Sequence, residues 1–481
     1  MRTRKNRREL TRRRCSLCGT LAAALLAGCA SQAPPPAVAI DAGDPVKAAY
    51  VVLGPGGAAV ARVITTSAAC PELEVDGARV AMVVRAAPAT EALRPTLSAP
   101  SDSKPSAFPV TTCEAHLAAD VQRVGVGGHA LPAPRRDPQR IVVIGDTGCR
   151  MKISDDAFQA CNDPADWPFA QVAAAAAAMR PDLVIHVGDY HYRENACPPG
   201  NRGCAGSPWG YGWDTWDADL FAPARALLAA APWIVVRGNH ESCSRAGQGW
   251  WRFLDPRPLV RERDCNDPAN DGIGDFSDPY AVPIAADTQL IVFDSSKVGT
   301  RALAITDPMY RIYSAQMRDA FALGRNVDYN FFMNHHPILG LAPDPTQQPT
   351  SVYPGNEALQ SVLQPIQGRQ LFPTNVQALI AGHYHLFEMV SFATPQPTQL
   401  ISGNAGSWLY PPLPHQLARS AQPASGAVIE SIVSTSEYGF MTIERGTGGT
   451  WRVDAWDRRG LPFTHCTLRG AKTHCVPETL P

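Results

Sequence analysis

The sequence of 481 residues lacks the features of a membrane-spanning protein and of a hydrolase with a serine nucleophile. One apolar stretch, Leu17–Gly28, is too short to cross a bilayer, and nothing later is long and apolar enough to be a transmembrane helix. Ser295 and Ser296 follow an apolar run, but no Gly-x-Ser-x-Gly elbow surrounds them, so a serine nucleophile is not expected. No internal repeat is evident.

The start of the chain differs in composition from the rest. Residues 2–14 carry eight Lys or Arg and one Glu, and residues 26–29 read Leu-Ala-Gly-Cys, which resembles a bacterial lipobox. We therefore predict a lipoprotein signal peptide over residues 1–28 and lipidation of Cys29. Ala30 carries no inner-membrane retention signal, which favours an exported protein anchored to the outer membrane and facing the periplasm. A cytoplasmic protein with a basic, apolar start is the alternative.

Cysteine usage agrees with export. Of thirteen cysteines, two lie in the predicted leader and Cys29 would carry the lipid, which leaves ten. An even number in an oxidising compartment suggests five disulfides, with a zinc cluster as the alternative. Connectivity stays open, but pairing of neighbours would link the cysteines as Cys149–Cys161, Cys197–Cys204 and Cys243–Cys265.

The chain without its predicted leader is acidic. Removing the leader's eight cations and one anion from a net charge of −1 leaves −8. Nucleic-acid phosphates are bound by clustered cations, so no nucleic-acid partner is expected. Small substrates are favoured instead, and the sequence predicts no oligomeric state.

Five short motifs occur in one order, each just after a short apolar run. They are Gly-Asp-Thr-Gly (145–148), Gly-Asp-Tyr-His-Tyr (188–192), Gly-Asn-His-Glu (238–241), His-His-Pro (335–337) and Gly-His-Tyr-His (382–385). Together they supply seven candidate oxygen or imidazole donors, the number that a two-metal hydrolytic centre needs when one carboxylate bridges. The set therefore indicates a phosphoester hydrolase.

The apolar runs before the motifs are predicted to be strands of an α/β fold. They cover residues 141–144, 183–187, 233–236, 329–333 and 376–380. The alanine-rich segment 167–180 predicts a crossover helix that joins the first two strands in a β-α-β unit. Sites in such sheets lie beyond the carboxyl ends of the strands, where these motifs stand.

The five motifs resemble those of the calcineurin-like metallophosphoesterases, in particular the purple acid phosphatases, over roughly residues 140–410. The pattern there is Asp-x-Gly, Gly-Asp-x-x-Tyr, Gly-Asn-His-(Asp/Glu), Val-x-x-His and Gly-His-x-His. Most of the superfamily has histidine where this chain has Gly148, and the purple subgroup places an iron-binding tyrosinate at the position of Tyr192. These two departures occur together, which favours the subgroup. Phe332 replaces the valine, but that position belongs to an apolar strand.

The resemblance implies a four-layer α/β/β/α sandwich and a dinuclear metal centre, with iron paired with zinc, manganese or iron. The implied ligands are Asp146, Asp189, Tyr192 and His385 for one metal and Asp189, Asn239, His335 and His383 for the other. Asp189 would bridge the two metals. His335 is chosen over His336 because the ligand usually lies two residues before the proline, which leaves His336 to face substrate. A tyrosine that only packs and hydrogen-bonds is the alternative for Tyr192.

His240 is the candidate acid, because it adjoins an implied ligand without being one. A histidine near a dianionic transition state can stay protonated close to neutral pH and donate a proton to the leaving group. The nucleophile would be a metal-bound hydroxide. His186 and His191 are expected to be structural, and Glu241 is expected to cap a helix or support the ligands.

These residues predict a phosphomonoesterase that acts on small phosphate esters and is similar to acid phosphatases. A phosphodiesterase that acts on nucleotides or phospholipid head groups is the alternative enzyme. A non-catalytic envelope protein with a structural metal site is the alternative of another class. The candidate acid argues against it, because a structural site needs none.

The predicted organisation has four parts. After the signal peptide, an Ala/Pro-rich tether covers residues 29–45, a small sandwich-like all-β domain covers 46–135 and a catalytic domain covers 140–481. The last strands, near 440–443 and 450–456, are expected to complete the second sheet.

Two long insertions follow ligand motifs. Residues 193–217 contain three tryptophans, and residues 341–355 are rich in proline. Both could form walls of the cleft, although the tryptophans could instead cover the core.

Overall fold

The first two predicted strands lie side by side in a large sheet. The computed structural model describes residues 43–344, 351–414, 416–418 and 421–477. In it, β11 (Arg140–Ile144) pairs in parallel with β14 (Leu183–His186), and α1 (Phe169–Ala178) connects them. α1 forms because alanine favours helix and because Phe169 and Val172 recur on its buried face. The β-α-β prediction is confirmed.

The large sheet has eleven strands. Their order is β28 (Lys472–Val476), β27 (Pro462–Arg469), β26 (Thr450–Asp457), β25 (Gly439–Arg445), β11, β14, β15 (Trp233–Val235), β1 (Val46–Leu53), β2 (Ala59–Thr65), β8 (Thr111–Leu117) and β5 (Val83–Ala86). The parallel strands β11, β14 and β15 lie in its middle, which places the first three motifs at one edge.

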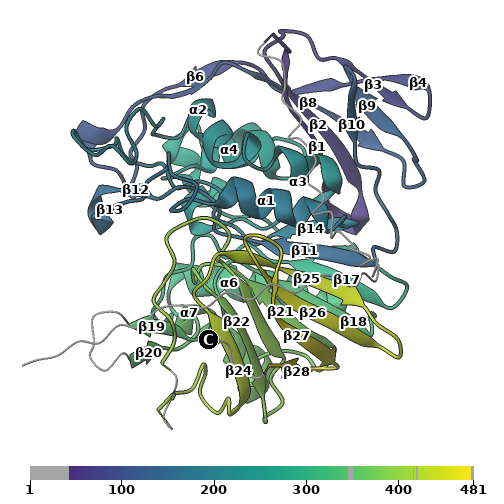
Figure 1. Cartoon of the computed structure of the whole chain (residues 1–481). Coiled ribbons are helices and arrows are strands. Elements are labelled where there is room, and N and C mark those ends of the chain that lie inside the picture. Colours follow the sequence, from purple (N-terminus) through teal and green to yellow (C-terminus); the bar gives the residue numbers. More distant parts are fainter. Residues whose placement is uncertain (1–42, 345–350, 415, 419–420, 478–481) are drawn as a thin grey trace, which may run out of the picture. The chain divides into compact units, whose positions relative to one another are not determined.

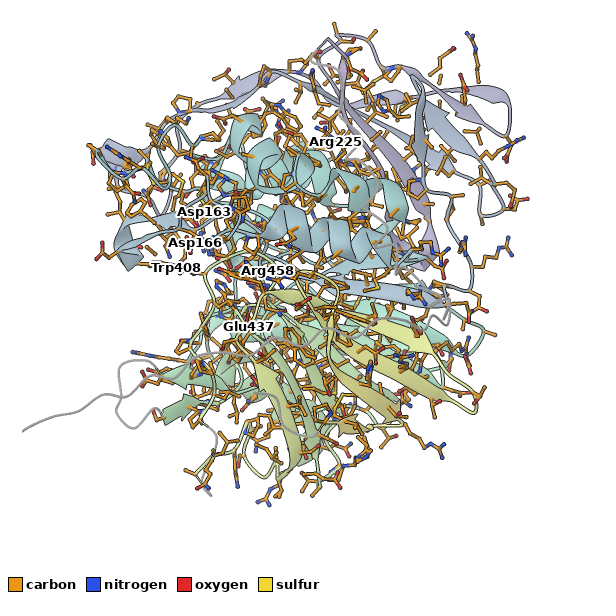
Figure 2. The ribbon with its side chains drawn as sticks, viewed as in Figure 1. Asp163, Asp166, Arg225, Trp408, Glu437 and Arg458 are labelled. Carbon is orange, nitrogen blue, oxygen red and sulfur yellow. A yellow bond between two sulfur atoms is a disulfide. The ribbon has the colours of Figure 1, made fainter. Side chains whose placement is uncertain are left out.

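The last strands of the chain belong to this first sheet. β25 pairs antiparallel with β11, with Thr442 opposite Val142, so the prediction that β25 and β26 complete the second sheet is wrong. The loop before α1 is tied to the same strands. Tyr438 Oη donates to the Asp166 carbonyl at 2.9 Å, and Arg458 donates to the backbone beside it (Figure 2).

The second sheet has seven strands and carries the last two motifs. Their order is β16 (Tyr280–Pro283), β17 (Thr288–Val292), β18 (Tyr329–Met333), β21 (Val376–Ala381), β23 (Thr398–Ser402), β22 (Phe387–Phe392) and β24 (Ile429–Thr435). Side chains of both sheets form one core between them, in which Val143 and Ile185 share a cluster with Leu290 and Met333.

Helices cover the outer faces of both sheets (Figure 1). α1 and α3 (Arg225–Ala230) pack on the first sheet, whereas α6 (Pro308–Gly324) and α7 (Glu357–Gln367) pack on the second. α6 begins where the Asp307 side chain accepts from the backbone N–H of Met309 at 2.8 Å. The predicted four-layer α/β/β/α sandwich is confirmed.

The chain before the first motif is all-β, as expected. Its remaining strands are β3 (Glu72–Val75), β4 (Ala78–Ala81), β9 (Val124–Val126) and β10 (His129–Leu131) in one small sheet, and the pair β6 (Ala89–Glu91) and β7 (Ser106–Phe108). β1 also continues the large sheet, through Val52 beside Trp233 of β15. The boundary between domains at 46–135 and 140–481 stays a prediction.

The two insertions have different surroundings. In the first, Trp216 is buried among core aromatics and Trp213 packs against them, so these tryptophans cover the core. The second contains β19 (Ala342–Asp344) and β20 (Ser351–Tyr353). The shorter elements are β12 (Met151–Lys152), β13 (Ala157–Phe158), α2 (Trp213–Trp216), α4 (Gly247–Gly249) and α5 (Asp271–Gly274).

Five disulfides are formed, as the cysteine count predicts. They are Cys70–Cys113, Cys149–Cys161, Cys197–Cys204, Cys243–Cys265 and Cys466–Cys475. The predicted signal peptide 1–28, Cys29 and most of the tether 29–45 lie outside the described residues. Among the helices that are described, none has the length and apolar character needed to cross a membrane.

Candidate metal centre

The five motifs meet beyond the carboxyl ends of strands from both sheets. Asp146, Asp189 and Asn239 follow strands of the first sheet, and His335 and His383 follow strands of the second. Asp146, Asp189 and His383 have positive φ values of 55°, 57° and 67°. Such backbone is unfavourable for non-glycine residues by about 1–3 kcal/mol and persists where the surrounding structure enforces it.

One buried carboxylate holds the backbone of the second and third motifs. Glu241 accepts from the N–H groups of Asp189 at 3.0 Å, Tyr190 at 2.9 Å and Gly238 at 3.1 Å. Burial, together with the nearby Asp189 carboxylate, raises the pKa of Glu241 to about 8. Glu241 therefore supports the neighbouring donors, as its sequence position suggested.

The first group of candidate metal ligands surrounds the buried phenol of Tyr192. Tyr192 Oη lies 2.9 Å from Asp146 Oδ1, 2.9 Å from Asp189 Oδ2 and 2.8 Å from His385 Nε2. Burial and the two carboxylates raise the pKa of Tyr192 well above its ordinary value. One hydroxyl proton cannot bond to three neighbours at once, so this cluster contains more acceptors than donors.

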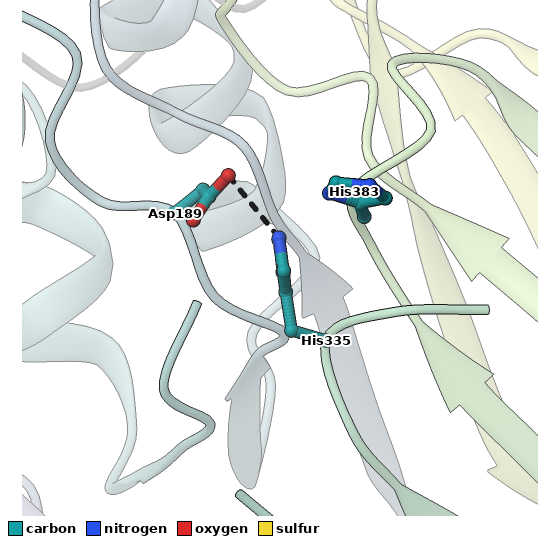
Figure 3. Close-up of side chains that lie close together, drawn as sticks. All are labelled: Asp189, His335 and His383. Atoms are coloured by element: carbon teal, nitrogen blue, oxygen red, sulfur yellow. Dashed lines mark ion pairs between the residues drawn. The ribbon is translucent and has the colours of Figure 1, made fainter. Parts of the chain in front are cut away.

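The second group shares the Asp189 carboxylate with the first. His335 Nε2 lies 3.1 Å from Asp189 Oδ2 and 3.1 Å from Asn239 Oδ1, and His383 Nδ1 lies 3.1 Å from the same amide oxygen. Donor atoms of Asp189, His335 and His383 all lie within 4.8 Å of one another (Figure 3). Asp189 Oδ2 thus contacts both groups, through Tyr192 Oη and His335 Nε2.

The hydrogen bonds behind the imidazoles suit cation binding. His335 Nδ1 lies 2.8 Å from the Val187 carbonyl, and His385 Nδ1 lies 2.6 Å from the Trp408 carbonyl. A carbonyl only accepts, so each Nδ1 carries a proton and each Nε2 faces the candidate ligands, where a bound cation would take the place of a second proton. Burial opposes a charged ring, but the Asp189 carboxylate prevails and raises the pKa of His335 to about 9. The donor set fits metal ions.

Comparison with known proteins decides the family. Residues 139–387 match the Calcineurin-like phosphoesterase family. The chain belongs to this family. It is therefore a metal-dependent phosphoester hydrolase, and its family implies a dinuclear centre.

A solved purple acid phosphatase has a similar fold. Purple acid phosphatase PPD1 from yellow lupin (Lupinus luteus) seeds is 14% identical, with a TM-score of 0.53 over 90% of this chain and 74% of that one. PhoD is 10% identical, with a TM-score of 0.48 over 91% of this chain and 93% of that one. No curated protein matches the chain.

The calcineurin-like chain has no room for a side chain at Gly148, where much of the superfamily has histidine. A Cβ atom there would lie 2.7 Å from Tyr192 N and 2.8 Å from Asp219 Oδ2. Asp219 accepts from the N–H groups of Tyr192 at 2.8 Å and Cys149 at 3.0 Å, which joins the first two motifs. The Tyr192 phenol reaches the donor cluster from the adjoining segment.

His240 lies beside the donor cluster and contacts two residues that sequence reasoning missed. Its Nδ1 is 2.7 Å from Glu194 Oε1, and Arg245 bonds to the same carboxylate. Its Nε2 is 3.8 Å from Asp189 Oδ2, and the centroid of its ring lies 3.9 Å from that of Tyr192, with the two rings tilted by 40°. Burial and Arg245 lower the pKa of His240 to about 3, contrary to the expected protonated ring.

The other histidines lie on different sides of the centre. His336 Nδ1 lies 3.0 Å from Ser295 Oγ, and the ring lines a cavity beside the centre. His186 stacks on Tyr190 at 3.7 Å behind the site, and His191 is buried next to aromatic rings. Ser295 also accepts from the His335 and His336 backbone, which gives it a structural role.

Proposed function

We propose that this phosphoesterase is a phosphomonoesterase with two adjacent metal ions. The observation that carries the proposal is the shared Asp189 Oδ2, which lies 2.9 Å from Tyr192 Oη and 3.1 Å from His335 Nε2. It joins the two donor groups at one atom. A phosphomonoester is close to a dianion at neutral pH and gains more from two cations than a diester monoanion does.

The proposed ligands of the two metal ions are the same residues that the sequence motifs implied. Asp146, Asp189, Tyr192 and His385 would hold iron, and Asp189, Asn239, His335 and His383 would hold zinc, manganese or a second iron. Bound metal ions would supply Lewis-acid activation of water and charge that attracts the phosphate. Phenolate and carboxylate oxygens around the first position suit a hard trivalent cation, and the imidazole-rich second position suits a divalent one.

His240 is proposed as the proton donor, with Glu194 and Arg245 as positioning residues. Nδ1 donates to Glu194 Oε1, and Nε2 lies 3.8 Å from Asp189 Oδ2 and 2.7 Å from Arg245 Nη2, which would turn toward the substrate when Nε2 takes up its proton. A substrate dianion near the ring favours its protonated form, which offsets the effect of burial and Arg245. Nε2 then gives its proton to the leaving-group oxygen. His336 faces the substrate from the cavity wall.

The test of this proposal is hydrolysis by the full-length chain in detergent. An aryl phosphate monoester and the matching diester are compared, with and without a chelator. Asn239→Ala removes an amide donor that lies 3.1 Å from both His335 and His383. Asn375→Ala is the matched control. Asn375 is partly buried just before β21, at the end of that strand away from the metal centre, and its side-chain amide donates to backbone carbonyls.

Monoester turnover that disappears in Asn239→Ala and with chelator, but persists in Asn375→Ala, supports the proposal. Faster diester turnover would assign a phosphodiesterase instead. Fully metallated protein that cleaves neither ester would contradict catalysis and favour a structural metal site.

We further propose that the protein is exported and held at the outer membrane by a lipid on Cys29. The five disulfides support export, because disulfides persist in oxidising compartments. Cys29→Ala should move the protein from the membrane fraction to the soluble periplasmic fraction. Wild-type protein found in the soluble fraction would contradict the anchor.

A further inference from the structure

A cavity of about 590 Å³ adjoins the candidate metal centre. His336 and His383 line it beside the centre. Residues of β19 and β20 and the residues that follow β20 form further parts of its wall. The ring centroids of His336 and His383 are 4.3 Å apart, and the rings are tilted by 46°. The cavity is therefore continuous with the place where a phosphoryl group would bind.

The cavity is far larger than a phosphoryl group requires. Pockets of about 300–1,000 Å³ hold whole organic ligands and bury most of their surface. A phosphate bound at the centre would leave most of the 590 Å³ to the rest of the ester. The volume therefore points to a bulky group attached to the phosphate.

The walls are mostly apolar, although Arg301 and Glu357 also line the cavity. Four prolines and three tyrosines line the cavity. Tyr384 Oη donates to the Pro354 carbonyl at 3.1 Å, which fixes one ring against the opposite segment. Tyr410 lies 6.4 Å from Tyr384 and 5.0 Å from the His385 ring. Fixed aromatic faces favour flat rings, because stacking adds to simple apolar burial.

We propose that this cavity binds an aromatic ring in the leaving group, so that the preferred substrates are phosphate esters of aryl alcohols or nucleosides. This inference rests on the proposed phosphomonoesterase function and names its substrate class. A flexible alkyl chain would fill the same volume but would lose rotational freedom and gain no stacking.

The test is calorimetric binding of phosphonates, whose P–C bond is not hydrolysed, to the full-length metallated protein. Phenylphosphonate is compared with methylphosphonate and hexylphosphonate. We expect phenylphosphonate to bind about tenfold more tightly than methylphosphonate, with hexylphosphonate closer to methyl. A nucleoside phosphonate in a further arm distinguishes a nucleobase from a simple aryl ring, and tight binding of either ring supports the proposal.

Two variants connect the preference to the cavity. Tyr353→Ala removes an aromatic wall whose residue is 52% exposed, so folding should survive, and should reduce the phenyl preference about threefold. Val352→Ala, on the same strand but not in the cavity wall, should leave the preference unchanged. Melting temperatures confirm that both variants fold.

Equal binding of phenyl and methyl, or of phenyl and hexyl, would overturn the proposal, as would a preference that Tyr353→Ala leaves intact. Failure of the proposed function looks different. In that case the diester is cleaved faster than the monoester or neither is cleaved, while the phenyl preference and its loss in Tyr353→Ala would still be measured.

Discussion

Single residues outside the recognised motifs set the orientation of the candidate acid. Glu194 and Arg245 are both nearly fully buried, they form an ion pair, and both contact the His240 ring. Nothing in their sequence positions reveals this, because Glu194 reaches His240 across 46 residues and belongs to no motif pattern. The negative charge of Glu194 favours a proton on His240 Nδ1, which lies 2.7 Å from Glu194 Oε1.

Glu194→Gln should lower kcat by about 10–100-fold, with a smaller effect on KM, because it weakens the contact that orients the general acid. The Glu194 carboxylate raises the pKa of His240, so its loss should lower that pKa and move the alkaline limb of the kcat profile to lower pH. Steady-state kinetics across pH measures both effects.

Glu194→Asp keeps the charge and should recover part of the activity. Glu194→Gln also leaves Arg245 without its buried partner, so its melting temperature must be recorded beside the kinetics. A folded Glu194→Gln protein with wild-type kcat and pH profile would show that Glu194 does not position the acid.

Tyr192→Phe removes the one phenol that contacts Asp146, Asp189 and His385. If Tyr192 binds ferric iron, the purified protein should absorb visible light and the variant should lose that band and about one metal equivalent. Tyr190→Phe is the matched control, since its hydroxyl is equally buried but bonds to backbone carbonyls. Unchanged metal content and spectrum in Tyr192→Phe would leave the tyrosine a packing role.

At the scale of strands and helices, local pattern predicted the elements but not all of their partners. The five runs before the motifs are strands because they are short, apolar and buried, and α1 follows its alanine content. The sheet that β25 joins depends on pairing with β11, about 300 residues earlier, which no local pattern records. Seven candidate metal ligands could be named from the sequence because each lies within a short motif. The contacts that hold one motif against another, such as those of Glu241 and Asp219, have no local sequence pattern.

A disulfide secures the segment that follows the third motif. Cys243 and Cys265 are 22 residues apart, and Cys243 lies four residues after Asn239. Replacing both cysteines by serine should cost about 3 kcal/mol of unfolding free energy through loop entropy, and should weaken metal binding because Asn239 becomes less fixed. Thermal unfolding and metal titration measure the two effects.

Cys466 and Cys475 supply the comparison. They join β27 and β28, at the outer edge of the first sheet. Replacing this pair should lower stability while leaving metal affinity at the wild-type value. Equal loss of metal affinity in both double variants would mean that the Cys243–Cys265 bond has no special effect on the centre.

For the molecule as a whole, two buried carboxyls, Glu388 and Glu241, make the free energy of unfolding depend on pH. Burial raises the pKa of Glu388 from 4.5 to about 8. Glu388 accepts from the Leu341 N–H at 2.9 Å, beside the start of β19. Between these two pKa values the folded protein holds a proton that the unfolded chain has released, so stability falls as pH rises.

Glu388→Gln should remove the contribution of Glu388 and leave that of Glu241, because glutamine keeps the acceptor oxygen without a titrating group. We expect Glu388 to lower wild-type stability by up to about 1.4 kcal/mol per pH unit from near pH 4.5 to near pH 8, and the variant to show a flatter curve. Denaturant unfolding across pH measures the difference. The exposed Glu437→Gln serves as control, and parallel curves for wild type and Glu388→Gln would contradict the assignment.

The left-handed backbone at Asp146, Asp189 and His383 has a consequence for protein engineering. Glycine at any of these positions would relieve the backbone while deleting a candidate metal donor. A screen for heat resistance alone would therefore enrich sequences that melt later and hydrolyse nothing. Thermostabilised versions of this enzyme need selection on turnover at every round, because at these three positions stability and activity favour different residues.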